Sequence, residues 1–110
     1  MSRDEQIKKR MAELTQIYSP LSAEKMSLAL PLIQNAVFIE FQMRDLQDII
    51  DDEGYIDEYQ NGNNQFGKKQ SAYLQAYNAL VKSYNMINTR LEGMLPKTTG
   101  KSKLDALMNE

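Results

Sequence analysis

A regular apolar seam near the carboxyl end constrains the fold of this chain more than any other feature. Apolar residues recur there in alternating steps of four and three, at Tyr73, Tyr77, Leu80, Tyr84, Ile87, Leu91 and Met94. That spacing places all seven residues on one face of an α-helix, and it is typical of helices that pack against other helices. We therefore predict a long helix over residues 70–95, whose seam is either a packing surface within the chain or a contact between subunits.

The composition limits the chemistry that the chain can perform. Its 110 residues suit one small domain, and they include no Cys and no His. The chain therefore lacks disulfides and thiolate nucleophiles, and it also lacks the usual general base and the commonest transition-metal ligand. No nucleophile–base pair or metal-ligand set can be assembled from the remaining residues. We expect a protein that is not an enzyme and that uses neither a cofactor nor a metal.

Charge is distributed unevenly along the sequence, although the net charge is only −2. Residues 1–59 carry 6 basic and 12 acidic groups, whereas residues 60–110 carry 7 basic and 3 acidic groups. The charged amino terminus lacks the apolar core of a signal peptide, and no window approaches the run of about 20 apolar residues that spans a bilayer. We expect a soluble cytoplasmic protein with no membrane partner and with opposite charges in its two halves.

Two further helices are expected upstream of the seam. Residues 3–18 carry one apolar stripe on an otherwise charged helix, formed by Ile7, Met11, Leu14 and either Ile17 or Tyr18. A longer helix is expected over residues 22–52, with Ser22 as its N-cap and Gly54 as a left-handed cap after its end. Pro31 lies inside this helix and removes one backbone hydrogen bond, so we expect a kink, or a break into two helices, near residues 27–31.

The longer helix is apolar on two sides. One stripe consists of Met26, Leu30, Ile33, Val37 and Phe41. The other consists of Leu28, Leu32, Ile39, Met43, Leu46 and Ile50. Because one neighbouring helix cannot cover both faces, this helix is either central to a bundle or shared between the core and a partner subunit, and we place it at the centre.

A polar turn separates the central helix from the last one. Residues 55–60 alternate loosely and Asn61-Gly62 is a strong turn signal, so we expect a short β-hairpin or an ordered turn over residues 55–68. Ser71 or a neighbour should begin the last helix, and Pro96 should follow its end. The predicted fold is mainly α: one small helical bundle over residues 1–96, followed over residues 97–110 by a polar tail or short docking helix.

Two motif-like patterns do not have the residues that their chemistry needs. The acidic residues around Gly54 invite comparison with a calcium loop, but Ile49 and Gln60 fall at two essential ligand positions. The stretch from Gly62 to Lys68 approaches a Walker motif, but Lys69 stands where Ser or Thr is required. We expect neither a calcium site nor a nucleotide site.

Basic residues in two places are candidates for contact with phosphate. Lys8, Lys9 and Arg10 lie on the first helix. Lys68 and Lys69 follow the polar turn and precede the last helix, whose free N–H groups could meet the same phosphate. The alternative for both places is an ordinary solvated charged surface.

The carboxyl half combines a polar turn, a lysine pair and a tyrosine-bearing helix in a fixed order. The residues concerned are Tyr59-Gln60-Asn61-Gly62, Asn64-Gln65, Gly67-Lys68-Lys69, Tyr77-Asn78, Lys82, Tyr84 and the closing Leu91 to Leu95-Pro96. Two helices and an acidic break at Gly54 precede them. Over most of residues 20–97 this pattern resembles the small terminase subunits of tailed phages and prophages of Gram-positive bacteria.

The resemblance implies a role in packaging viral DNA. Small terminase subunits assemble into rings, bind viral double-stranded DNA and regulate a large terminase subunit that supplies ATPase and nuclease activity. On this basis we expect a homo-oligomer in the host cytoplasm, with Lys8, Lys9, Arg10, Lys68 and Lys69 as its DNA contacts. The alternative, which the net negative charge favours, is a phage structural or chaperone-like helical module that binds another protein and no DNA.

Overall fold

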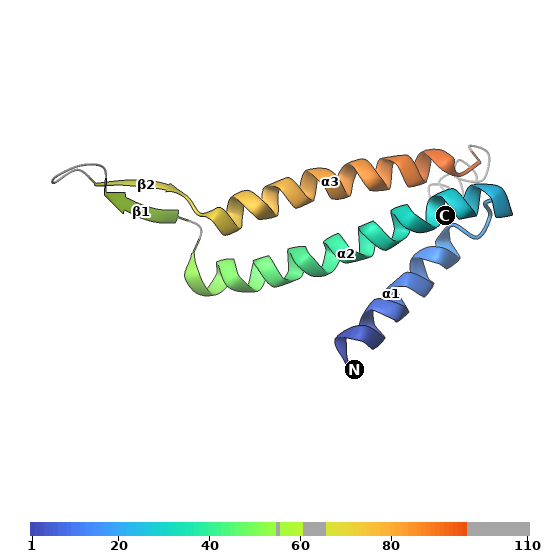
Figure 1. Cartoon of the computed structure of the whole chain (residues 1–110), viewed down its shortest axis with the longest axis horizontal. Helices are drawn as coiled ribbons and strands as arrows, with labels where there is room; N and C mark the ends of the chain where they lie inside the picture. Colours follow the sequence, from blue (N-terminus) through green and yellow to red (C-terminus); the bar gives the residue numbers. More distant parts are fainter. Residues whose placement is uncertain (55, 61–65, 97–110) are drawn as a thin grey trace, which may run out of the picture. The chain divides into compact units, whose positions relative to one another are not determined.

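The computed structural model describes residues 1–54, 56–60 and 66–96, and these form a mainly α-helical protein (Figure 1). In chain order the elements are α1 (Arg3–Ile17), α2 (Ala23–Glu53), β1 (Ile56–Gln60), β2 (Phe66–Gln70) and α3 (Ala72–Met94). The predicted mainly α-helical class is confirmed. The Asn61-Gly62 turn and the tail expected over residues 97–110 lie outside the described residues.

Serine hydroxyls cap the starts of all three described helices. The Oγ atoms of Ser2, Ser22 and Ser71 each accept a hydrogen bond from the backbone N–H three residues later, at 3.2, 3.2 and 3.0 Å. Each bond satisfies an N–H group that the first turn of a helix leaves without a partner. At the other end of α2, Gly54 adopts a φ of 82° and its N–H donates to the Ile50 carbonyl at 2.8 Å. The predicted caps at Ser22, Gly54 and Ser71 are confirmed.

Helix α2 runs without interruption through Pro31, so the expectation of a break into two helices near residues 27–31 is wrong. Pro31 cannot donate a hydrogen bond to the Ser27 carbonyl, and proline inside a helix costs about 3 kcal/mol. The proline lies on an exposed side of α2, where water can reach that carbonyl. On the opposite side Ala29 and Ile33 are fully buried, and their burial keeps the helix continuous.

The chain divides into two compact units. One consists of Met1–Phe38 with Asn85–Glu110, and the other consists of Ile39–Tyr84. The first unit contains α1, the first half of α2 and the end of α3. The second unit contains the rest of α2, both strands and the start of α3. Each long helix therefore contributes residues to both units.

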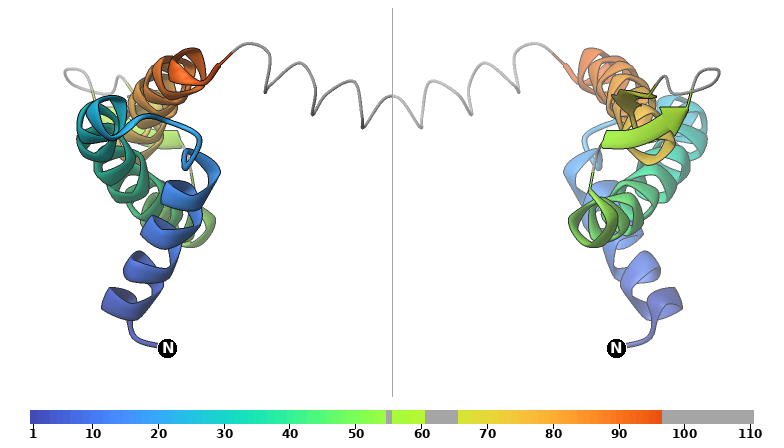
Figure 2. Two further views of the ribbon diagram at one scale, coloured as in Figure 1. Left: turned by 90° about the vertical axis from the view of Figure 1, so that its right-hand side faces the viewer. Right: turned by 90° about the vertical axis from the view of Figure 1, so that its left-hand side faces the viewer.

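In the first unit, α1 meets α2 at the turn over residues 18–22 and diverges from it toward the amino terminus (Figures 1 and 2). Tyr18 rather than Ile17 continues the apolar stripe of α1, because Tyr18 is buried and Ile17 is half exposed. The buried apolar residues of this unit are Leu14, Tyr18, Leu21, Ala29, Ile33, Ala36, Val37 and Leu91. Burial of each large aliphatic side chain stabilises the fold by about 1.5–3 kcal/mol.

In the second unit, β1 and β2 pair antiparallel and connect α2 to α3 (Figure 1). Ile56 lies opposite Gln70 in the register, and Gln60 lies opposite Phe66. Side-chain hydrogen bonds join the second half of α2 to the start of α3, and Phe41 of α2 is buried. This half of α2 is therefore packed against α3 and is held to it by polar contacts as well.

Candidate functional site

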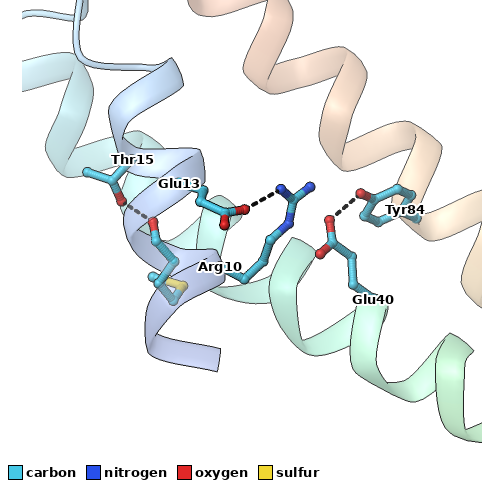
Figure 3. A network of polar contacts seen from close by, with 6 residues as sticks. Arg10, Glu13, Thr15, Glu40 and Tyr84 are labelled. Atoms are coloured by element: carbon cyan, nitrogen blue, oxygen red, sulfur yellow. Dashed lines mark hydrogen bonds and ion pairs between the residues drawn. The ribbon is translucent and has the colours of Figure 1, made fainter. Parts of the chain in front are cut away.

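The amino-terminal helix presents two of the predicted DNA contacts to solvent. Lys8 and Lys9 are both exposed on α1. Arg10 is only partly exposed, and its Nη1 lies 3.0 Å from Oε2 of Glu13, one turn further along the helix (Figure 3). Because Glu13 already neutralises much of the guanidinium charge, Arg10 is a weaker candidate for phosphate contact than its two neighbours.

The other predicted DNA contacts, Lys68 and Lys69, belong to β2. Their cross-strand partners in the register are Glu58 and Asp57, so each lysine is opposite an acidic residue of β1. The two predicted groups of basic residues fall in different units, and each is a separate candidate.

The start of α3 has less free anion-binding capacity than the sequence suggests. Ser71 is 1 % exposed, and its hydroxyl accepts the Leu74 N–H. One of the N–H groups that a phosphate could use is therefore already satisfied within the chain. Lys68 and Lys69 of β2 come just before this cap, but the Leu74 N–H is bound to the Ser71 hydroxyl of the same chain.

The tyrosine seam of α3 packs partly on α2 within the second unit. Tyr77 accepts a hydrogen bond from Nε2 of Gln47 at 3.0 Å. The Tyr84 hydroxyl donates to Oε2 of Glu40 at 2.5 Å (Figure 3). Leu80 lies between them and is half-buried, whereas Tyr73 at the start of the helix is 41 % exposed.

The remainder of the seam lies in the first unit. Leu91 is completely buried, and Ile87 and Met94 are half-buried. Buried and half-buried side chains along one helix face are typical of packing within a chain. Of the two predicted roles of the seam, packing therefore accounts for the contacts of Tyr77, Tyr84 and Leu91.

The described residues contain no group of three or more His, Cys, Asp or Glu side chains that could hold a metal ion. The acidic end of α2, with Asp51, Asp52 and Glu53 exposed, precedes the cap at Gly54. Gly54 ends a helix here, which explains its left-handed conformation without a calcium loop. Within the same described ranges, no helix combines the length and the apolarity that crossing a bilayer requires.

Several large apolar side chains of α2 and α3 are exposed in the described part of the chain. Phe38 of α2 belongs to neither predicted stripe, yet it is 62 % exposed. Leu28 belongs to the second predicted stripe of the helix that was placed at the centre of the bundle, but it is 64 % exposed rather than buried. On α3, Met86 is also exposed and lines a shallow groove with Asn85, Thr89 and Arg90. The spacing of Leu28, Asn35 and Phe38, seven residues and then three, is the sequence signal that could have revealed the α2 surface.

Comparisons with protein-family models, curated proteins and solved structures give no match to this chain.

Proposed function

We propose that this protein is a DNA-packaging adaptor of the small-terminase type, which self-associates, binds viral duplex DNA and regulates a large terminase subunit in the host cytoplasm. The observation that carries the proposal is the exposed pair Lys8 and Lys9 on α1, the helix that diverges from the rest of its unit. The order of turn, lysine pair and tyrosine-bearing helix in the sequence supports the same assignment.

Lys8 and Lys9 suit contact with a phosphate backbone. Both side chains are exposed, and as neighbours on a helix they point about 100° apart, so they can contact two different phosphates. Lysine contributes a compact, strongly hydrated charge that suits phosphate oxygens. The pair would therefore position the DNA backbone, and the short hairpin with Lys68 and Lys69 would supply a second phosphate contact.

Self-association accounts for the apolar surface of the helices. Leu28, Phe38 and Met86 are each more than half exposed. A ring of subunits, as the family resemblance implies, would cover such surfaces and bring several lysine pairs onto one DNA molecule.

The test is a fluorescence-anisotropy titration of a labelled DNA duplex at several salt concentrations. The Lys8→Ala/Lys9→Ala variant should reduce the slope of log affinity against log salt by about 2 for each chain that contacts the duplex, because each lost phosphate contact contributes about 0.9. A control variant, Lys25→Ala/Lys82→Ala, removes the same charge from two other exposed lysines and should leave the slope near that of the wild type. Equal slopes for both variants would refute a specific role for the α1 pair.

The hairpin lysines are tested in the same titration with Lys68→Ala/Lys69→Ala. If both places contact phosphate, this variant should also lower the slope of log affinity against log salt, and its effect should add to that of the α1 variant. No change in this variant would remove the hairpin from the proposed DNA surface while leaving the α1 pair in it.

A second candidate function is a helical protein-interaction module that binds no DNA. The exposed apolar side chains of α2 and α3 favour it, because they would suit a protein partner as well as a second subunit. Wild-type protein that shows no salt-dependent binding to duplex DNA would select this alternative over the packaging adaptor.

A further inference from the structure

The last turn of α2 carries charges that its own helix does not favour. Asp51, Asp52 and Glu53 are exposed there, and Asp48 is exposed one turn earlier. The last turn contains no basic residue. Because the carboxyl end of a helix has a partial negative charge, acidic side chains at this end lower the stability of the helix. Departures from such local rules are expected mainly at functional places, so this acidic end indicates a role outside its own helix.

The shallow groove on α3 has complementary chemistry. Its described lining residues are Asn85, Met86, Thr89 and Arg90, which include one cation and no anion. The Thr89 hydroxyl donates to the Asn85 carbonyl at 2.8 Å, so these two polar groups are satisfied within the helix. Met86 is 61 % exposed, and the Arg90 side chain is exposed as well. The groove therefore offers a partner one apolar side chain and one guanidinium.

The end of α2 offers the matching pair of groups. Ile56 follows the Gly54 cap by two residues and is 51 % exposed, so an apolar side chain comes directly after the exposed carboxylates. An arginine binds a carboxylate through two parallel N–H groups, and apolar side chains near such pairs exclude water from them. The end of α2 and the groove on α3 are thus complementary in both charge and apolarity.

We propose that the acidic end of α2 in one copy of this chain docks in the α3 groove of a neighbouring copy. The acidic end is defined by five exposed residues: Asp48, Asp51, Asp52, Glu53 and Ile56. The contact is heterologous, because each copy uses its groove for one neighbour and its acidic end for the other, and such contacts close into a ring where the rotation permits. The inference rests on the self-association within the proposed function and names the two surfaces that perform it.

The separation of charge along the sequence favours the same head-to-tail arrangement. The acidic end lies in the half with 12 acidic and 6 basic groups, and the groove lies in the half with 3 acidic and 7 basic groups. A contact between identical surfaces would place like charges together, whereas a head-to-tail contact places opposite charges together. The acidic end also repels phosphate, so this contact is separate from the DNA surface proposed on α1.

Mixing two variants that each associate poorly tests the contact. Arg90→Glu reverses the charge of the groove and keeps the acidic end, whereas Asp51→Lys/Asp52→Lys/Glu53→Lys reverses the end and keeps the groove. In sedimentation equilibrium at low salt, each variant alone should associate about tenfold more weakly than the wild type, because its altered surface meets a like charge in every neighbour. An equimolar mixture should recover most of the association, because each variant supplies the surface that the other accepts.

The controls separate a specific contact from a general effect of charge or folding. Lys25→Glu reverses an exposed cation of α2 outside the groove and should associate as the wild type does. Lysines in the last turn of α2 suit the helix dipole, so the triple variant should keep its helix, which circular dichroism checks in every variant. Raising the salt should weaken association of the wild type, because exposed charges are then screened.

Three results would overturn the contact. These are a mixture that associates no better than its two components, a triple variant that associates as well as the wild type, and a wild type that stays monomeric at tens of micromolar. Failure of the packaging function is recognised separately. Recovery in the mixture, together with no binding of duplex DNA by the wild type, leaves the contact standing and refutes only the role in DNA packaging.

Discussion

The hydrogen bond between Tyr84 and Glu40 provides a sharp test of how the tyrosine seam is used. Tyr84 of α3 donates to the Glu40 carboxylate of α2 at 2.5 Å, and both side chains are half-buried. A hydrogen bond to a charged group contributes about 1.5–3 kcal/mol when water is excluded, and partial exposure lowers that value. We expect Tyr84→Phe to reduce the free energy of unfolding by about 1–2 kcal/mol.

Urea unfolding followed by circular dichroism measures this loss. With a slope of about 1–3 kcal/mol per molar urea, the midpoint should fall by roughly 0.3–2 M. All proteins are compared at one concentration, because self-association would otherwise shift the midpoint. Tyr73→Phe removes the same hydroxyl from the exposed end of the seam and should change the stability by less than about 0.5 kcal/mol.

A double-mutant cycle with Glu40→Gln isolates the interaction between the two side chains. The coupling free energy between Tyr84→Phe and Glu40→Gln should be about 1 kcal/mol. A coupling near zero, or equal losses in Tyr84→Phe and Tyr73→Phe, would refute the idea that this part of the seam is held within the chain.

Three further variants test the packing and the helix ends by the same unfolding assay. Leu91→Ala deletes a fully buried side chain and should lower the free energy of unfolding by about 2–5 kcal/mol. Met86→Ala, on the exposed face of α3, should lower it by less than about 0.5 kcal/mol, and similar losses in the two variants would contradict the assigned core. Ser71→Ala removes a buried N-cap and should cost about 1–2 kcal/mol, more than the exposed cap variant Ser2→Ala, and the reverse order would contradict the role of Ser71. Pro31→Ala restores a backbone N–H inside α2 and should raise the free energy of unfolding by about 1–3 kcal/mol, and a less stable variant would show that α2 requires the proline.

Local chemistry made much of the secondary structure predictable. Ser22 and Ser71 precede apolar helical patterns, and Gly54 follows an acidic helix end, so each marked a boundary that the structure confirms. These signals depend on a few neighbouring residues, and no tertiary contact is needed to interpret them. The mainly helical class followed from the same patterns.

Features that depend on tertiary packing were not predictable in the same way. The break at Pro31 was a sound inference from one residue, but burial of Ala29 and Ile33 outweighs the lost hydrogen bond. The spacing of Tyr77 and Tyr84 could not distinguish a partner helix of the same chain from one of another subunit. Only the hydrogen-bond partners Gln47 and Glu40 distinguish these two possibilities.

The candidate site was predictable only in part. The exposure of Lys8 and Lys9 agrees with a charged outer face, but the ion pair of Arg10 with Glu13 depends on side-chain conformation. Phe38 was overlooked because a core pattern was sought, and the residue lies between the two stripes assigned to the core.

Light scattering of the purified protein, alone and with excess duplex DNA at low and moderate salt, tests the central claim most directly. The account predicts a self-associated species of a multiple of 12.7 kDa that gains the mass of DNA at low salt and loses it as salt rises. It also predicts that Lys8→Ala/Lys9→Ala keeps the protein mass but gains less DNA. A monomer whose mass is unchanged by DNA at either salt concentration would contradict the account.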